Sequence, residues 1–136
     1  MAKYLSQDWL DLGRIAVNNN EEFRKLGKNL NLTIYHVISD VPNKGTVYFW
    51  STFKDGKCVE VQLGEKSVDD FTLTASYDIW KQIHNGSLEI VQTILEKKLH
   101  VEGKPVKGIK IFKLAPLMNK IIATIETDFT IVRSIT

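Results

Sequence analysis

The sequence predicts an α+β fold, with an N-terminal helical region, five mainly antiparallel strands and further helices at the C-terminal end. Three observations lead to this class. Apolar residues alternate with a period of two in four segments between residues 30 and 75, short turns join these segments, and the apolar spacing is helical before and after them. The 136 residues are 43% hydrophobic and 25% charged, so we expect one globular domain over residues 1–136.

Two helices are predicted in the N-terminal region. Ser6 can cap the first helix, which should end near Val17. Its apolar residues recur at helical spacing, at Leu5, Trp9, Leu12 and Ala16. Asn20 can cap a short second helix over residues 21–26, and Gly27 would end it as the C′ residue.

Four consecutive strands follow, over residues 30–38, 46–53, 59–63 and 71–75. Asp55 and Gly56 form the dipeptide preferred in a two-residue hairpin turn, where both residues need positive φ. Cys58 shares its parity with Glu60 and Gln62, so we expect it on the more polar face of its strand. Short turns between consecutive strands favour an antiparallel meander.

The pattern becomes helical again at residue 77. The first helix after this point should end before Gly86. A second helix should begin near Leu88 and carry Lys97 and Lys98 in its last turn, where they face the negative end of the helix dipole. A brief fifth strand is expected over residues 99–101.

The last helix should begin at Pro105, which is tolerated in a first turn. Pro116 should kink or restart it. Beyond Pro116, apolar residues form a broad one-sided face, at Leu117, Met118, Ile121, Ile122 and Ile125. The pattern leaves the structure of residues 127–136 open.

Charge and cysteine content exclude several classes of protein. Lys and Arg number 18 against 16 Asp and Glu, and a net charge of +2 gives no basis for a nucleic-acid partner. The single cysteine, Cys58, excludes an internal disulfide and a cluster of thiolate ligands, which fits a reducing compartment. The first ten residues lack the apolar run of a signal peptide, and charges interrupt the apolar stretch 109–125. We therefore expect a cytoplasmic protein with no membrane span.

No residue pattern indicates catalysis. His36, His84 and His100 lack the spacing of a helical metal site, and we expect His36 to be an ordinary histidine at the edge of the core. Cys58 has little nearby positive charge to activate it as a nucleophile. The adjacent acids Asp69 and Asp70 are expected to be solvated. We predict no enzyme activity, no metal site and no cofactor.

Residues Asp70 to Ile121 resemble the sterol carrier protein 2 (SCP2-like) family. The matching text is FTLTASYDIWKQIHNGSLEIVQTILEKKLHVEG, in which a strand leads into a short helix ending in Asn-Gly, then a second short helix and a last strand ending in Glu-Gly. The resemblance covers roughly 50 residues at the level of motifs. The family's peroxisomal Ser-Lys-Leu address is replaced by Ser-Ile-Thr at residues 134–136, which again favours a cytoplasmic location.

The resemblance implies that helices cover one face of a five-stranded sheet and leave an apolar tunnel. It also implies non-catalytic binding or transfer of a sterol, a fatty acid or a fatty acyl-CoA. From the residues alone, an apolar stripe that lines a tunnel cannot be distinguished from one that fills a core. The candidate ligand contacts are nine large apolar residues, Leu73, Trp80, Val91, Leu95, Val101, Ile109, Phe112, Leu117 and Ile121.

Two kinds of partner are predicted besides a lipid. An anionic membrane surface could attract the lysines concentrated between residues 96 and 120, although lysines are also common on solvated helix faces. These lysines are Lys97, Lys98, Lys104, Lys107, Lys110, Lys113 and Lys120. The alternative function is a homo-oligomeric interaction module, such as a homodimer, that buries the apolar face of the C-terminal helix between copies.

Overall fold

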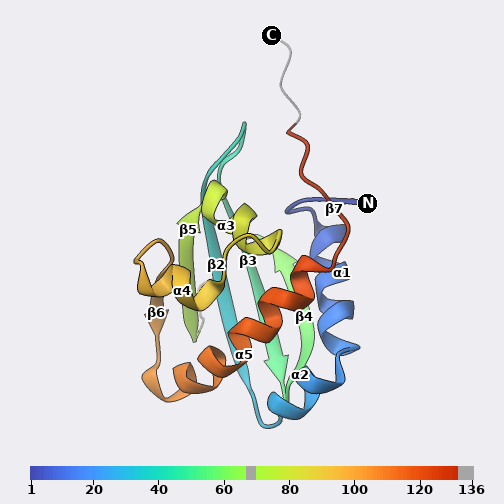
Figure 1. Cartoon of the computed structure of the whole chain (residues 1–136), viewed down its shortest axis with the longest axis vertical. Helices are drawn as coiled ribbons and strands as arrows, with labels where there is room; N and C mark the ends of the chain where they lie inside the picture. Colours follow the sequence, from blue (N-terminus) through green and yellow to red (C-terminus); the bar gives the residue numbers. More distant parts are fainter. Residues whose placement is uncertain (67–69, 132–136) are drawn as a thin grey trace.

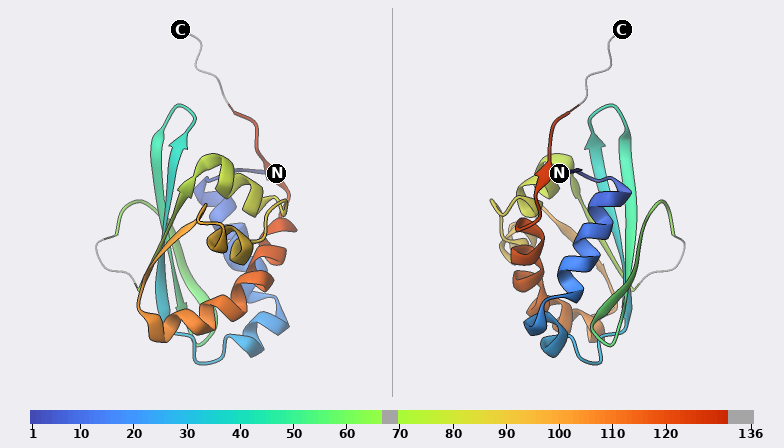
Figure 2. Two further views of the ribbon diagram at one scale, coloured as in Figure 1. Left: turned by 60° about the vertical axis from the view of Figure 1, so that its left-hand side comes forward. Right: turned by 90° about the vertical axis from the view of Figure 1, so that its right-hand side faces the viewer.

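The computed structural model describes residues 1–66 and 70–131. A five-stranded sheet forms one layer, and helices pack on one of its faces (Figure 1, Figure 2). The strand order is β4-β3-β2-β5-β6, with bounds Leu32–Val41 for β2, Gly45–Lys54 for β3, Lys57–Leu63 for β4, Phe71–Ser76 for β5 and His100–Gly103 for β6. The predicted α+β class and the mainly antiparallel sheet with helices on one face are confirmed.

The side-chain alternation along β2 explains why one face of the sheet is covered. Leu32, Ile34 and Ile38 are buried in the core beneath the helices. Tyr35 alternates with them and stacks on Tyr48 of β3, with ring centroids 5.7 Å apart. Each large apolar side chain that leaves water in this way contributes about 1.5–3 kcal/mol of transfer free energy.

The fourth predicted strand takes a different place from the one expected. β5 pairs in parallel with β2, with Ile34 opposite Phe71, so it lies on the far side of β2 from the hairpin formed by β3 and β4. The prediction of a four-stranded antiparallel meander is therefore wrong for this strand. Alternation along a strand shows which face is buried, but it does not show which strand lies beside it.

The hairpin between β3 and β4 confirms the predicted turn and corrects the placement of Cys58. Asp55 and Gly56 have φ of 50° and 78°, as a two-residue turn of this type requires. A bulge follows, because Phe53 pairs with Cys58 whereas the preceding residue of β3 pairs with Glu60. The bulge reverses the parity of the strand, so Cys58 is buried against the core rather than on the polar face.

The helices span Gln7–Asn18 (α1), Glu21–Leu26 (α2), Tyr77–His84 (α3), Ile90–Leu95 (α4) and Pro105–Ala123 (α5). The predicted caps of the first two are present. The Ser6 hydroxyl oxygen accepts a hydrogen bond from the Trp9 N–H at 3.1 Å, and the Asn20 side-chain oxygen accepts one from the Phe23 N–H at 2.8 Å.

Gly27 ends α2 for a reason other than the predicted one. Its φ is −85°, which any residue can adopt. A Cβ atom at this position would lie 2.9 Å from the carbonyl oxygen of Phe23 and 3.1 Å from the Cα of Gly56. Glycine is therefore needed because the end of α2 packs directly against the hairpin turn.

α4 is shorter than predicted. It ends at Leu95, and Lys97 follows it in the left-handed conformation with φ of 63°. The Lys98 N–H donates to the carbonyl oxygen of Thr93 at 3.0 Å, which satisfies a group that the helix end leaves unpaired. Lys97 and Lys98 thus lie in the turn after the helix rather than in its last turn.

α5 runs through Pro116 as one helix that bends along its length (Figure 2). The expected restart at Pro116 does not occur. A proline inside a helix has no N–H to donate to the carbonyl four residues earlier, here that of Phe112, and this favours a bend. The bend lets α5 follow the end of the sheet before it crosses the inner face (Figure 1, Figure 2).

The two ends of the described chain meet in a small parallel sheet that was not predicted. Ala2–Lys3 (β1) pairs with Thr127–Asp128 (β7), and the Tyr4 N–H donates to the carbonyl oxygen of Asp128 at 2.9 Å. Two-residue strands carry too little pattern to be recognised in a sequence. The sequence pattern made no prediction for residues 127–136, of which residues 132–136 lie outside the described residues.

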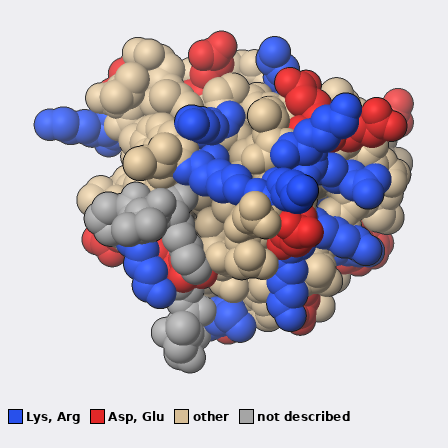
Figure 3. All heavy atoms as spheres, turned by 90° about the horizontal axis from the view of Figure 1, so that it is seen from below, with Lys and Arg blue, Asp and Glu red and all other residues tan. Residues whose placement is uncertain are grey.

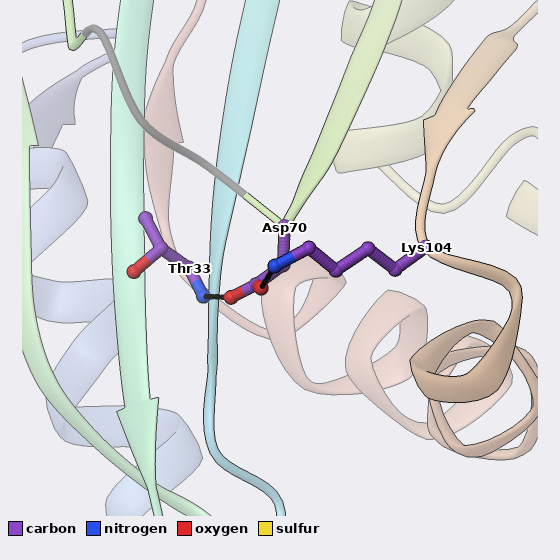
Figure 4. Close-up of polar contacts among 3 residues, drawn as sticks. All are labelled: Thr33, Asp70 and Lys104. Atoms are coloured by element: carbon purple, nitrogen blue, oxygen red, sulfur yellow. Dashed lines mark hydrogen bonds and ion pairs between the residues drawn. The ribbon is translucent and has the colours of Figure 1, made fainter.

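Asp70 joins three elements near the start of α5 (Figure 4). Its carboxylate accepts a hydrogen bond from the Thr33 N–H at 2.8 Å and another from Nζ of Lys104 at 3.1 Å. The Asp70 side chain is only 16% exposed. The expectation of a solvated acid is therefore wrong for Asp70, whereas Asp69 lies outside the described residues.

Candidate ligand-binding cavity

A cavity of about 140 Å³ lies between the inner face of the sheet and the helices. β2, β3, β4 and β5 form one wall, and α1, α3 and α5 contribute to the other. The side chains at its surface are mostly aliphatic or aromatic, including Phe23, Phe49, Leu73, Trp80, Leu114 and Ile122. These come from both ends of the sequence, so the cavity is a product of the tertiary structure.

The volume sets a limit on what the cavity holds in this conformation. Apolar cavities of this size stay dry and hold a ligand about the size of one aromatic ring. Pockets that enclose drug-sized molecules have volumes of about 300–1,000 Å³. The structure therefore has an apolar cavity, but a tunnel long enough for a sterol is not shown.

His36 places an imidazole at the cavity wall, in the middle of β2. The ring stacks on Phe49 with centroids 4.1 Å apart and lies 5.6 Å from the ring of Trp80. Part of the ring borders the cavity, whereas Nδ1 is closed off from water and has no hydrogen-bond partner. Burial, with a further contribution from the nearby His84, lowers the pKa of His36 to about 3, so the ring is neutral at physiological pH.

His84 lies at the end of α3, and one of its two ring nitrogens has a hydrogen-bond partner. Its Nδ1 lies 2.7 Å from the hydroxyl oxygen of Tyr4, and its ring stacks on Trp80 with centroids 5.2 Å apart. Burial lowers the pKa of His84 to about 3 and raises the pKa of Tyr4 above its ordinary range. The two histidines are 48 positions apart in the sequence, which is why their proximity was not predicted.

A second polar region of the wall comes from α1, β3 and β4. It contains Arg14, Ser51 and Cys58. Burial is the main influence on the Cys58 thiol and raises its pKa to about 11, although the charge of Arg14 acts in the opposite direction. The thiol is therefore protonated at neutral pH, which agrees with the expectation that Cys58 is not a nucleophile.

Asn119 is a buried residue that the sequence analysis did not single out. Its side-chain oxygen accepts a hydrogen bond from the Ile90 N–H at 2.8 Å, and its amide nitrogen donates to the carbonyl oxygen of Ile83 at 2.9 Å. It thereby fixes α5 against the end of α3 and the start of α4. The available signal was a single amide inside the apolar stripe of α5.

The nine predicted ligand contacts fall into three groups. Leu73 and Trp80 border the cavity. Val101, Ile109 and Phe112 border a separate open groove on the outside of the molecule. The remaining four predicted contacts line neither the cavity nor the groove, namely Val91, Leu95, Leu117 and Ile121.

Two members of this last group differ strongly in burial. Ile121 is buried in the core, whereas the side chain of Leu95 is 68% exposed. The expectation that Leu95 meets the sheet is therefore wrong. α4 has only six residues, so a helical pattern read over a longer segment assigned Leu95 to the wrong side.

The outer groove lies between β6 and the first half of α5. Phe71, Val101, Ile109, Phe112 and Lys113 border it, and its volume is about 560 Å³. Ile109 is 67% exposed and Phe112 is 41% exposed, so large apolar side chains face solvent here. Such exposure on one helix face is typical of surfaces that contact a partner or a membrane.

The predicted lysines are spread over several elements. Lys104 pairs with Asp70, and Lys98 lies 3.6 Å from a carboxylate oxygen of Glu96. Lys110 donates to the carbonyl oxygen of Lys28, which links α5 to the segment after α2. The remaining lysines are exposed, namely Lys97, Lys113 and Lys120, and the side chain of Lys107 lies outside the described residues.

A band of Lys and Arg side chains crosses the lower face of the molecule (Figure 3). α2 and the first half of α5 lie at this end (Figure 1). We call this end of the molecule the basic face. Its elements α2 and the first half of α5, with the turn after α2, carry five basic residues, namely Arg24, Lys25, Lys28, Lys110 and Lys113.

Within residues 1–66 and 70–131, no three His, Cys, Asp or Glu side chains gather in a way that could hold a metal ion. None of the helices in the described part of the chain is long and apolar enough to cross a membrane.

Comparison with known proteins gives a family match and several similar folds. Residues 14–116 match the SCP-2 sterol transfer family. A crystal structure of sterol carrier protein 2 is 16% identical with a TM-score of 0.81, and the match covers 91% of this chain and 100% of that chain. A conserved hypothetical protein from Thermus thermophilus, described as a candidate sterol carrier protein, is 16% identical with a TM-score of 0.76, over 90% of each chain.

A third similar structure is the ligand-free sterol carrier protein 2 of Yarrowia lipolytica. It is 21% identical with a TM-score of 0.59, over 91% of this chain and 96% of that chain. At these identities the likeness to solved structures shows the fold. A search of curated proteins gives no match.

Proposed function

Because the chain belongs to the SCP-2 sterol transfer family, we propose that it binds one lipid molecule in the cavity beneath α5 and carries it without changing it. The observation that carries this proposal is the apolar cavity between the sheet and the helices, which is lined mostly by aliphatic and aromatic side chains. The ligand classes are those implied by the family resemblance, namely a sterol, a fatty acid or a fatty acyl-CoA.

The cavity must enlarge to hold such a ligand, and α5 is the element best suited to move. α5 contributes several residues to the helical side of the cavity. Because Pro116 has no N–H, α5 also lacks one of the backbone hydrogen bonds of a regular helix. Burying about 300 Å² of ligand hydrocarbon would contribute roughly 7 kcal/mol before the costs of association and of enlarging the cavity. We therefore expect micromolar or weaker affinity unless a polar group of the ligand is also bound.

Arg14 supplies a positive charge at the cavity wall and supports a fatty acid among these classes. A guanidinium keeps its charge at all relevant pH values and can bind a carboxylate through two hydrogen bonds. A carboxylate placed beside Arg14 would avoid the cost of burying an unpaired charge.

A carrier role agrees better with the site than a catalytic one. His36 and His84 are neutral, and Cys58 is protonated, so none of them offers a group poised for acid, base or nucleophilic chemistry near neutral pH. A cytoplasmic location, expected from the single cysteine, belongs to the same proposal.

Lipid transfer also requires contact with a membrane, and the basic face supports this part of the proposal. Lys113 stands beside the exposed side chains of Ile109 and Phe112 at the outer groove. Positive charges attract an anionic lipid surface, and neighbouring apolar side chains can enter it. This interaction should be reversible and should weaken with salt, because screening shortens the range of the attraction.

The alternative of a homo-oligomeric module is not supported by the packing. The apolar stripe proposed as the interface is used within the chain, since Leu114 and Ile121 are buried and Leu117 and Met118 pack on the core. A homodimer through another surface stays a prediction. Native mass spectrometry after gentle purification tests it together with the presence of a co-purified lipid.

The binding experiment uses delipidated protein and fluorescent sterol, fatty acid and acyl-CoA probes. We expect at least one class to saturate the protein at tens of micromolar or below. Ser51→Leu should place extra carbon atoms in the cavity, which lowers probe occupancy without lowering stability. Thr74→Leu is the matched control, because Thr74 alternates with the buried residues Leu73 and Ala75 of β5.

Failure of all three probe classes to saturate the unsubstituted protein would contradict the carrier proposal. Equal loss of binding in Ser51→Leu and Thr74→Leu would contradict the assignment of the cavity as the binding site.

A further inference from the structure

His36 borders the cavity, and its imidazole has a hydrogen-bonding capacity that is unused in this conformation. Its Nδ1 is buried without a partner. A buried polar atom in this state destabilises the fold relative to a satisfied one, and native structures rarely leave such an atom unpaired. His84, the neighbouring histidine, does have a partner, the hydroxyl of Tyr4 at 2.7 Å. Of these two neighbouring histidines, only His36 therefore has an unpaired buried Nδ1.

The surroundings of His36 hold the ring in place without using its nitrogen atoms. Phe49 stacks on the ring at an interplanar angle of 10°, and Trp80 lies against it at 54°. The indole N–H of Trp80 is already donated to the carbonyl oxygen of Val37 at 3.0 Å. The ring is thus oriented by aromatic contacts on two sides, which suits a group that must meet a ligand in a defined position.

The charge state of the site indicates which polar group it accepts. A neutral imidazole offers one donor and one acceptor, which matches the hydrogen-bonding capacity of a hydroxyl group. A carboxylate at this position would be buried beside two neutral histidines, with a large desolvation cost and no cation on the ring to offset it. A carboxylate instead has Arg14 in the separate polar region beside Cys58.

We propose that His36 is a specificity-determining residue: when α5 moves and the cavity enlarges, Nδ1, which is covered in this conformation, becomes accessible and hydrogen-bonds the hydroxyl group of a neutral lipid alcohol. This inference rests on the proposed lipid-binding function and adds to it a second polar anchor. Ligands with a hydroxyl group are held at His36, and ligands with a carboxylate are held at Arg14. The two anchors thereby let one cavity distinguish lipids by their polar group.

The experiment compares two fluorescent probes that share one hydrocarbon chain, cis-parinaric acid and the corresponding alcohol. His36→Phe removes both ring nitrogens and keeps an aromatic ring for stacking on Phe49. We expect it to weaken binding of the alcohol about 3- to 10-fold, the effect of one lost hydrogen bond, and to change binding of the acid less than about 2-fold. His36→Asn, whose side-chain amide reaches the position of Nδ1, should restore most of the affinity for the alcohol.

Arg14→Met is the matched variant at the other anchor, since it keeps most of the side-chain length and removes the charge. It should weaken binding of the acid and leave binding of the alcohol within about 2-fold. A merely structural role for either residue would change the affinity for both probes alike. Thermal unfolding of each variant shows that it is folded, and His36→Phe should be no less stable than the unsubstituted protein, because it removes an unpaired polar group.

A measurement on the unsubstituted protein keeps the proposal testable if a variant fails to fold. The ¹⁵N signals of the His36 ring should shift on addition of the alcohol and stay in place on addition of the acid. Binding of both probes with an unchanged alcohol-to-acid ratio in His36→Phe, or with no shift of the ring signals, overturns the role of His36 alone. Absence of binding of either probe by the unsubstituted protein overturns the lipid-binding proposal itself.

Discussion

His36 and His84 are two histidines whose imidazole rings are buried in this core. Burial holds the pKa of each near 3, against an ordinary value of 6.5, because the charged imidazolium would lose its hydration. Both rings are also part of one aromatic group with Trp80. The same burial that makes the rings neutral therefore makes the folded state sensitive to acid.

We predict that the free energy of unfolding decreases as the pH falls from about 6.5 toward 3. In this range the unfolded chain binds a proton at each histidine and the folded chain does not, so stability rises with pH. Each ring should contribute about 1.4 kcal/mol per pH unit. Denaturant unfolding at pH 7, 6 and 5 measures the slope, which should be smaller in His36→Phe.

His100→Gln is the control for this pH series, because His100 is exposed on β6 and its ring contacts Glu102 in solvent. It should keep the slope of the unsubstituted protein. A slope that His36→Phe leaves unaltered would show that His36 does not resist protonation in the folded state.

Among the elements, α5 both lines the cavity and is attached to other elements near its two ends. Its second half is fixed by Asn119, whose amide holds α3 and α4, and its start is fixed by the contact between Lys104 and Asp70. Pro116 lies between these two attachments. A helix held at both ends and weakened between them can lift from the sheet locally while its ends stay in place.

Ile121 of α5 and Leu95 of α4, two of the predicted ligand contacts, differ in burial, so we expect different losses of stability when each is replaced by alanine. Ile121→Ala should lower the free energy of unfolding by about 2–4 kcal/mol, because Ile121 is buried in the core and outside the cavity lining. Leu95→Ala should change it by less than about 0.5 kcal/mol, since Leu95 is largely exposed. Chemical denaturation of the ligand-free protein compares the two variants, and similar losses would contradict the packing described for α4 and α5.

At the scale of the whole molecule, basic side chains gather at the end formed by α2 and the first half of α5 (Figure 3), and α5 exposes the apolar side chains of Ile109 and Phe112. α1 also exposes apolar side chains, at Leu12 and Ile15, but it carries Asp8 and Asp11. Charge therefore distinguishes two apolar surfaces that exposure alone would treat as equal.

We predict that Ile109→Ser combined with Phe112→Ser reduces flotation of the protein with vesicles containing phosphatidylglycerol. Leu12→Ser combined with Ile15→Ser should leave flotation unchanged, because α1, with Asp8 and Asp11 against Arg14, has no excess of positive charge to attract anionic lipid. Binding of the unsubstituted protein should fall as salt is added and should be absent with phosphatidylcholine vesicles. Equal recovery with neutral and anionic vesicles would contradict the electrostatic part of this prediction.

By itself, the sequence determined the type and approximate bounds of most elements. Period-two alternation defined the buried faces of β2 and β5, Asp55-Gly56 defined the hairpin turn, and the caps Ser6 and Asn20 defined helix starts. These features depend on residues close together in the chain, where backbone geometry and side-chain period fix the outcome. The motif from residue 71 to residue 103 also sufficed for the family resemblance, which the match over residues 14–116 confirms.

Only the tertiary structure decided which elements lie side by side and what they enclose. The parallel pairing of β5 with β2 and the meeting of His36 with His84 join residues distant in the sequence. The bulge that buries Cys58 lies within one hairpin, but the alternation of residues does not reveal it. The candidate site depends on such contacts. Leu73 and Trp80, which were predicted as ligand contacts, border the cavity, and so do Arg14 and Asn119, which were not predicted. Local patterns state which side of an element avoids water, but the shape of the space between elements depends on how all of them pack together.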